Sequence, residues 1–111
     1  MHIDDLDGKF TSINFFAWEA DVTILVVDET GVPVVDATVE GGWTVGSASS
    51  SSCITNGEGV CTVTQTGLWI WNRSTTFTVE DVLHDVLIYK PEDNADPDGD
   101  SDGMAITVNR Y

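Results

Sequence analysis

The sequence predicts an all-β sandwich of about seven short antiparallel strands, with residues 1–111 forming a single domain that carries one disulfide. Three observations support this fold class. Short segments of β-prone residues are separated by turn residues at intervals of eight to twelve, as in sandwich domains. The chain has ten glycines and three prolines but no helix-favouring runs. A length of 111 residues allows one hydrophobic core but not two.

The first predicted strand region is residues 10–28, where aromatic and β-branched side chains roughly alternate, most strongly in DVTILVVD. The turn residues DETGVP follow. Residues 34–43 alternate again, with Val35, Ala37 and Val39 on one face. We expect this second strand to pair antiparallel with the first.

The remaining strands are shorter. A serine-rich surface loop leads into the segment that contains Cys53, and GVCTVTQTG alternates as the next strand. The segment LWIWNRSTTFTVEDV supplies inward apolar residues at Phe77 and Val79, and DVLIYKP is expected to add a short strand. The last strand is MAITVNRY, with Ile106 and Val108 on one side. Helix is limited to one turn near EDVLHD.

The two cysteines, Cys53 and Cys61, lie eight positions apart across the turn sequence TNGEG. Two strands that flank a tight turn bring their α-carbons within bridging distance, so a disulfide is the favoured interpretation. The alternatives are a buried pair of free thiols, or a metal pair that lacks its other ligands. A disulfide places the chain in an oxidising compartment.

The net charge of −15, from nineteen acidic and four basic residues, constrains the partners. So negative a surface repels phosphate backbones and anionic headgroups, which argues against nucleic-acid and membrane-surface binding. No apolar run approaches the roughly eighteen residues that a membrane helix needs. The opening MHIDDLDGKF lacks the apolar core of a signal peptide. Together with the disulfide, these features suggest a piece of a larger secreted or cell-surface protein.

Carboxylates recur at every second position of an acidic stretch near the C-terminus, with glycines at positions 99 and 103. They are Asp96, Asp98, Asp100 and Asp102. Calcium takes six to eight oxygen ligands, which alternating aspartates and a glycine bend can direct to one centre. The pattern predicts calcium as the cofactor. Magnesium is less favoured because it retains its waters and binds few carboxylates. The competing interpretation is a solvated acidic linker.

The stretch is not an EF-hand, although DGDSDG matches the start of that twelve-residue loop. The twelfth position is Asn109 rather than a bidentate glutamate, and the flanking sequence favours strand over helix. A site of this kind would need ligands from elsewhere. Asp5 and Asp7, which also alternate before a glycine, are the expected donors if both segments lie at the same end of the sandwich.

The four tryptophans fall into two pairs. Trp18 and Trp43 are expected to pack between the sheets. Trp69 and Trp71 are two positions apart and share a face if their segment is extended. If that face is exposed and the rings are coplanar, they would stack on sugar rings as a carbohydrate-binding module does. If it is buried, they belong to the core or an interface.

The sequence gives no support for an enzyme. His2 and His84 are the only histidines, and no serine lies in a G-x-S-x-G turn. His2 beside the aspartates is a candidate ligand for a metal other than calcium, although a surface histidine is the simpler interpretation. A sandwich of this size leaves little room for a substrate cleft between paired carboxylates.

Four segments together resemble a known group of domains. VVDETGVPVVDATVEGGW is similar to the first hairpin of Ig-like and prealbumin-like modules of bacterial extracellular proteins. With HIDDLDG, CITNGEGVC and NADPDGDSDGMAITV, the chain resembles acidic Ig-like accessory modules of secreted bacterial proteases and other exported enzymes. It departs from that group at Asp4 and Met104, where the group has glycine and threonine. The resemblance implies a calcium-stabilised accessory sandwich without catalysis.

The expected function is therefore that of a non-catalytic, calcium-binding extracellular module that serves as spacer, stabiliser or adhesion domain. Its expected partners are other domains of the same secreted protein. The alternatives are a carbohydrate-binding module that uses Trp69 and Trp71, and a self-associating adhesin or filament subunit, because exposed sheet edges can join by strand addition.

Overall fold

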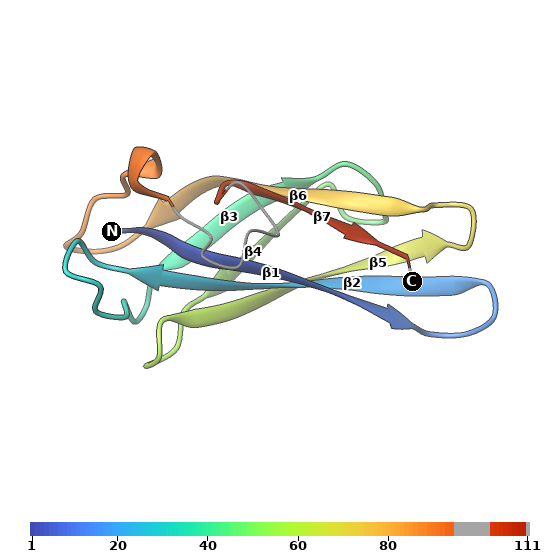
Figure 1. The fold of residues 1–111 in the computed structure, drawn as a ribbon, viewed down its shortest axis with the longest axis horizontal. Coiled ribbons are helices and arrows are strands. Elements are labelled where there is room, and N and C mark those ends of the chain that lie inside the picture. The colour runs from blue at the N-terminus through green and yellow to red at the C-terminus, as the bar shows by residue number, and fades with distance from the viewer. Residues whose placement is uncertain (95–102, 111) are drawn as a thin grey trace.

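The computed structural model describes residues 1–94 and 103–110, and these form a β-sandwich of two antiparallel sheets (Figure 1). The first sheet has the strand order β1-β2-β5 and the second has the order β4-β3-β6-β7. The strands of the described residues are β1 (His2–Ser12), β2 (Ala17–Val27), β3 (Thr38–Trp43), β4 (Ser50–Ile54), β5 (Val60–Trp69), β6 (Ser74–Leu83) and β7 (Ala105–Asn109). The all-β prediction is thus confirmed.

The core lies between the two sheets and is filled by alternate side chains of the strands. On β2, Trp18, Ala20, Val22, Ile24 and Val26 all point inward and are buried. The facing sheet contributes the buried side chains Val39, Trp43, Phe77, Val79, Ile106 and Val108. The inward positions predicted for Phe77, Val79, Ile106 and Val108 are confirmed. Period-two alternation places a whole apolar set on one face of a strand, which accounts for this success.

The N-terminal segment forms β1, an eleven-residue strand that the sequence interpretation did not include. It pairs with β2 from His2 to Ser12 and buries both Ile3 and Leu6. These two residues are three positions apart, so simple alternation would turn one of them outward. A register shift between Ile3 and Asp5 adds one residue to the strand and returns Leu6 to the core. Because the bulge interrupts the alternation of buried and exposed residues, a period-two pattern does not predict this strand.

The predicted single strand region over residues 10–28 is instead a hairpin, with its turn at residues 13–16. The side-chain oxygen of Asn14 accepts hydrogen bonds from the amides of Phe16 (2.8 Å) and Ala17 (3.0 Å). An asparagine that accepts a bond from the amide two residues ahead closes a tight turn. Asn14 therefore reverses the chain within a run of aromatic residues that otherwise suggests a strand.

The second predicted strand lies in the opposite sheet. It begins at Thr38 as β3, pairs with β4 and β6, and does not pair with β2. The chain first follows β2 closely, since the amide of Val34 donates to the carbonyl of Val26 (2.9 Å). It then crosses to the other sheet where Asp36 has a φ of 62°. This bend leaves Val35 exposed while Ala37 and Val39 are buried, so the prediction that the three residues share one face is wrong for Val35.

Residues 85–91, predicted as a short strand, contain no strand: residues 85–90 are irregular and Pro91 begins a 3-10 turn. His84 organises the irregular part, because its Nδ1 accepts the amides of Val86 (3.1 Å) and Leu87 (3.2 Å). No helical turn forms near residues 80–85, the place to which helix was limited by the sequence, since β6 continues to Leu83. The one helix in the described part of the chain is a 3-10 turn, η1 (Pro91–Asp93). Neither described range contains a helix long and apolar enough to cross a membrane.

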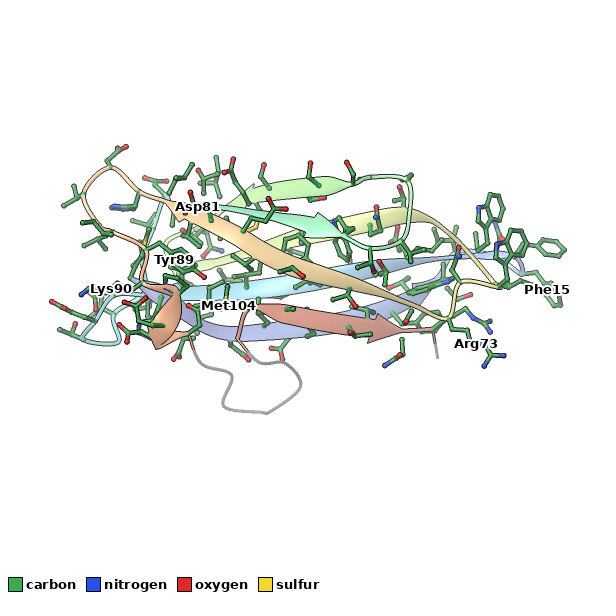
Figure 2. All side chains as sticks on the ribbon, turned by 90° about the horizontal axis from the view of Figure 1, so that it is seen from above. Phe15, Arg73, Asp81, Tyr89, Lys90 and Met104 are labelled. Atoms are coloured by element: carbon green, nitrogen blue, oxygen red, sulfur yellow. A yellow bond between two sulfur atoms is a disulfide. The ribbon has the colours of Figure 1, made fainter. Side chains whose placement is uncertain are left out.

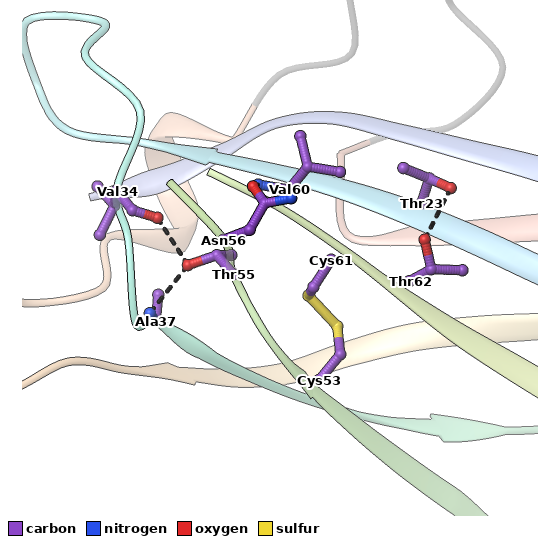
Figure 3. Close-up of a disulfide and its surroundings, with 9 residues drawn as sticks. All are labelled: Thr23, Val34, Ala37, Cys53, Thr55, Asn56, Val60, Cys61 and Thr62. Atoms are coloured by element: carbon purple, nitrogen blue, oxygen red, sulfur yellow. Dashed lines mark hydrogen bonds between the residues drawn. A yellow bond between two sulfur atoms is a disulfide. The ribbon is translucent and has the colours of Figure 1, made fainter. Parts of the chain in front are cut away.

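The disulfide between Cys53 and Cys61 is confirmed, with a Cα–Cα distance of 5.8 Å (Figure 3). Cys53 lies on β4 and Cys61 on β5, so the bond joins the two sheets across the core. Close to it, the hydroxyl of Thr55 donates to the carbonyl of Val34 (2.6 Å) and accepts the amide of Ala37 (2.9 Å). These contacts fasten the point where the chain changes sheets.

Candidate functional site

Exposed aromatic side chains gather at one end of the sandwich, where the β1–β2 and β5–β6 turns lie. We call this cluster the aromatic end; its members are Ile13, Phe15, Phe16, Trp69 and Trp71. Phe15 is 85% exposed and Trp71 is 69% exposed. Figure 2 shows Phe15 and Arg73 at the same end of the molecule, opposite Lys90. Exposed clusters of large apolar side chains are typical of contact surfaces.

Hydrogen bonds join the two turns of the aromatic end into one unit. The amide of Ile70 donates to the carbonyl of Phe16 (2.9 Å), which ties the second turn to the first. The side-chain oxygen of Asn72 accepts the amide of Trp69 (3.0 Å), and the amide of Asn72 donates back to the carbonyl of Trp69 (2.9 Å). The aromatic side chains are therefore carried on a braced backbone.

A buried tryptophan anchors this backbone to the core. The indole N–H of Trp18 lies 3.0 Å from the carbonyl oxygens of both Trp69 and Asn72, and it donates to them. The Trp18 ring itself is buried against Phe10, with 5.7 Å between the ring centroids. Binding costs less conformational entropy when the groups that make the contact are already held in place. This bracing therefore suits a binding surface.

Trp69 and Trp71 are exposed and stacked on each other, with ring centroids 5.5 Å apart and an interplanar angle of 12°. Of the core or interface placement expected for a buried pair, the core placement is therefore wrong, and an interface stays a prediction. Each ring covers one face of the other, so the two rings do not lie side by side as one flat sugar platform. Phe15 and Phe16 meet edge to face, with centroids 5.3 Å apart.

The aromatic end also carries two of the four basic residues of the chain, Arg73 and Arg110. The amide of Arg110 donates to the carbonyl of Arg73 (2.8 Å), which holds them side by side. Neither guanidinium forms an ion pair with a carboxylate in residues 1–94 and 103–110. Glu19, which pairs with Thr11, is the acidic residue on the strands beside this turn. In the part of this end that the structure describes, the two arginines therefore outnumber the acidic residue, whereas acidic residues outnumber basic ones in the whole chain.

The opposite end of the sandwich contains a cavity of about 320 Å³. We call it the acidic end; its lining includes Asp28, Glu29, Val86, Ile88, Lys90 and Asp93. Val86 is 81% exposed and Ile88 is 77% exposed. This end thus combines exposed aliphatic side chains with three carboxylates and one lysine.

Local hydrogen bonds shape the acidic end. Asp28 Oδ1 accepts the hydroxyl (2.7 Å) and the amide (2.8 Å) of Thr30 and the amide of Val32 (3.0 Å). The bond from the Thr30 hydroxyl and then the backbone bonds lower the pKa of Asp28 below its usual value. The Met1 amine donates to the Ile88 carbonyl (2.8 Å), which holds the apolar segment against β1.

The predicted calcium ligands are only partly described. Asp96, Asp98, Asp100 and Asp102 lie outside the described residues. Asp5 and Asp7 lie on β1. Within residues 1–94 and 103–110, no group of three or more His, Cys, Asp or Glu side chains is placed to hold a metal ion. The side-chain oxygen of Asn94, the last residue described before the acidic stretch, accepts the amide of Ile3 (2.8 Å), so Asn94 lies beside the strand that carries Asp5 and Asp7.

Both histidines take part in local contacts. Nε2 of His84 lies 3.2 Å from the Val35 carbonyl, while its Nδ1 accepts two backbone amides. Nε2 of His2 lies 4.0 Å from Asp4.

A further cavity, of about 470 Å³, lies over β3, β4 and β6 and is lined by serines and glycine together with Glu40 and Glu80. Its described lining contains no histidine that could act as the base for a serine nucleophile, and no cysteine that could act as a nucleophile itself.

Sequence reasoning missed most of the aromatic end. It identified Trp69 and Trp71 but assigned Phe15 and Phe16 to a strand. The signal that would have found them is Asn14, a turn-forming residue inside SINFFAW. The acidic end carried no comparable signal, because it joins residues 28–30 with residues 86–93 only in the folded chain.

Comparison with known proteins adds no further identification: the chain matches no protein-family model, no curated protein and no solved structure.

Proposed function

We propose that the chain is a non-catalytic, extracellular accessory module that adheres to a partner through its aromatic end. The observation that carries this proposal is the braced cluster of exposed aromatic side chains, with Phe15 and Trp71 foremost. Surface clusters of Trp and Phe with a neighbouring arginine have the composition of interaction hot spots. The disulfide supports an oxidising, extracellular setting.

A non-catalytic role is supported by the use that the fold makes of its reactive residues. Both cysteines are oxidised to the disulfide, and His84 serves as an acceptor for backbone amides. Phe15 and Trp71, which carry no titratable group, are strongly exposed at the aromatic end. These features favour binding over group transfer.

Calcium remains part of the proposal as a stabiliser of the acidic stretch. The supporting observation is that Asn94, two residues before Asp96 in the sequence, accepts the amide of Ile3 on the strand that carries Asp5. Bound calcium would offset the mutual repulsion of the carboxylates, and extracellular modules bind calcium with dissociation constants of about 10⁻⁴ to 10⁻³ M. Calcium at about 100 times the dissociation constant would stabilise the fold by about 2.7 kcal/mol.

Polysaccharide binding is the second candidate function. Its support is the exposure of Trp69 and Trp71. Their stacked arrangement leaves one outer face on each ring, which suits the end or edge of a sugar chain better than a flat crystalline surface. A sugar ligand would therefore occupy a single indole face.

The proposal is tested by adhesion of beads that carry the chain through its N-terminus, so that the aromatic end points outward (Figure 1). The test surfaces are polysaccharide films, phosphatidylcholine bilayers and a layer of the chain tethered through its C-terminus. We expect the beads to adhere to at least one surface. The double substitution Phe15→Ser and Trp71→Ser should abolish adhesion, while Ile54→Ser, exposed on β4, should preserve it. Absence of adhesion to every surface, or adhesion that survives the double substitution, would contradict the proposal.

A further inference from the structure

We infer that the partner of the aromatic end is the acidic end of a second copy of this chain, so that copies associate head to tail. The inference rests on the proposed function and names its partner. Both surfaces are present on every copy, at opposite ends of the sandwich (Figure 2). One presents protruding aromatic side chains and the other presents a cavity of about 320 Å³.

The apolar parts of the two surfaces are complementary in form. Phe15 and Trp71 project from turns, whereas Val86 and Ile88 border the cavity at the other end. Burial of apolar area is the main favourable term in association, at about 25 cal/mol for each Å² removed from water. Insertion of one surface into the other would remove from water the most exposed apolar side chains at both ends.

The charged parts are complementary in sign. Arg73 and Arg110 have no carboxylate partner within the described residues, and the cavity of the other end is lined by three carboxylates against Lys90 and the Met1 amine, which is already bonded to the Ile88 carbonyl. An arginine that meets a carboxylate at a partly buried contact makes a charge-assisted hydrogen bond. The net charge of −15 opposes association as a whole. At physiological ionic strength, salt screens repulsion between charges that are more than about 8 Å apart. The long axis of the molecule measures 44 Å, so most charges of two joined copies are farther apart than that. The charges at the contact therefore determine the electrostatic part of the association energy.

The position of the two surfaces determines the kind of assembly. They lie at opposite ends of the long axis, so the contact joins two different surfaces rather than one surface with itself. Such heterologous contacts form open chains unless the rotation closes a ring. The cross-section measures 25 × 21 Å, so an end-to-end contact would bury on the order of 500 Å² of each copy, which is the range of weak and transient interfaces.

Sedimentation equilibrium on the full chain, over protein concentrations from about 1 μM to about 1 mM, tests the inference. The monomer mass is 12.0 kDa. We expect the average mass to rise steadily with concentration and to pass the dimer without a plateau. Phe15→Ser with Trp71→Ser at the aromatic end should weaken association at least about tenfold, and so should Val86→Ser with Ile88→Ser at the acidic end. Ile54→Ser should leave it unchanged.

Mixing the two double variants gives the sharpest result. Each retains one intact surface, so an equimolar mixture should form one-to-one complexes and nothing larger. Charge variants repeat the test without loss of apolar residues: Arg73→Glu and Glu29→Lys should each weaken association, and their mixture should restore pairs. Circular dichroism spectra that match the wild type establish that each variant is folded.

Several outcomes would overturn the inference. One is a wild-type chain that remains monomeric throughout the concentration range. Another is a dimer plateau that survives Val86→Ser with Ile88→Ser, since this would mean that two aromatic ends bind each other. A third is a monomer that binds phosphatidylcholine vesicles or a polysaccharide through Phe15 and Trp71, which would leave the proposed adhesive function standing with a different partner.

Discussion

Two pairs of tryptophans divide this small sandwich into a region that holds the fold and a region that faces outward. Trp18 and Trp43 are buried, and each indole N–H has an acceptor: Trp18 donates to backbone carbonyls and Trp43 donates to Ser51 Oγ (2.9 Å). Trp69 and Trp71 are exposed and contact each other. The same residue type therefore serves the core in one place and a surface in another.

The difference between the pairs comes from strand geometry. Trp18 and Trp69 lie on the adjacent strands β2 and β5, near the same end of the sheet. Successive side chains of a strand point to opposite faces, so one residue faces the core while its near neighbour on the paired strand faces solvent. Trp71 lies beyond the end of β5, in the turn. We conclude that the core does not require the exposed pair, which leaves those residues available for contact.

The largest expected effect tests this division directly. Trp18→Ala removes a buried ring together with two hydrogen bonds, and we expect it to lower the free energy of unfolding by about 3–5 kcal/mol. Trp71→Ala should change it by no more than about 0.5 kcal/mol. Denaturant unfolding followed by circular dichroism measures both. Equal losses of unfolding free energy for the two variants would contradict the assignment of Trp18 to the core and of Trp71 to the surface. If Trp18→Ala does not fold, Trp18→Phe should still lose more stability than Trp71→Phe.

The disulfide provides the next largest effect. Replacement of both Cys53 and Cys61 by serine removes the crosslink between the sheets, and we expect a loss of about 2–3 kcal/mol from the chain-entropy model. Adhesion through the aromatic end should persist where the variant remains folded, because no contact of that end uses the disulfide. Reduction of the wild type is the matched control and should give a similar loss. A loss of adhesion in the folded variant would mean that the two regions are coupled.

Calcium is expected to act on the body of the sandwich and not on the aromatic end. Addition of about 10 mM calcium should stabilise the fold by roughly 1–3 kcal/mol and raise the melting temperature by several degrees. Thermal melting at neutral pH, with calcium and with a chelator, measures the change. Asp5→Asn with Asp7→Asn should reduce the shift if these residues contribute ligands. An unchanged midpoint in the wild type would remove calcium from the proposal.

A smaller effect is expected at the acidic end. The pKa of Asp28 is lowered on folding, so its ionised form adds stability above its unfolded pKa of about 3.8, and that contribution is lost as the pH falls through the lower folded value. Asp28→Asn should therefore cost stability at neutral pH, and its difference from the wild type should shrink below about pH 4. Unfolding measured from neutral pH downward, with Glu29→Gln as a control for simple loss of charge, tests this. A difference that persists at the lowest pH would contradict the assignment.

Several features of the fold could be predicted from local sequence because a single physical rule determines each of them. Strict alternation identified β5 and β7, and turn residues at short intervals identified an all-β fold. The spacing of Cys53 and Cys61 around a turn was sufficient for the disulfide. It did not reveal that the turn connects two different sheets, since strand pairing is a property of the whole fold.

The errors occurred where tertiary contacts override local pattern. The bulge in β1 breaks alternation between Ile3 and Leu6, and Asn14 turns the chain within an apolar run. Residues 85–91 have strand-like composition but are held as a loop by His84 and the N-terminal amine. Exposure of Trp69 and Trp71 depends on where β5 ends, which their spacing alone does not determine.

We conclude that a locally basic, exposed aromatic end lies on an otherwise acidic molecule. Quenching of tryptophan emission by iodide and by caesium tests it most directly, because the two ions report the sign of the charge beside an exposed indole. We predict that iodide quenches the wild type, aided by Arg73 and Arg110, and that Trp69→Phe with Trp71→Phe removes this quenching. Quenching by caesium alone, or iodide quenching that survives the double substitution, would contradict the account.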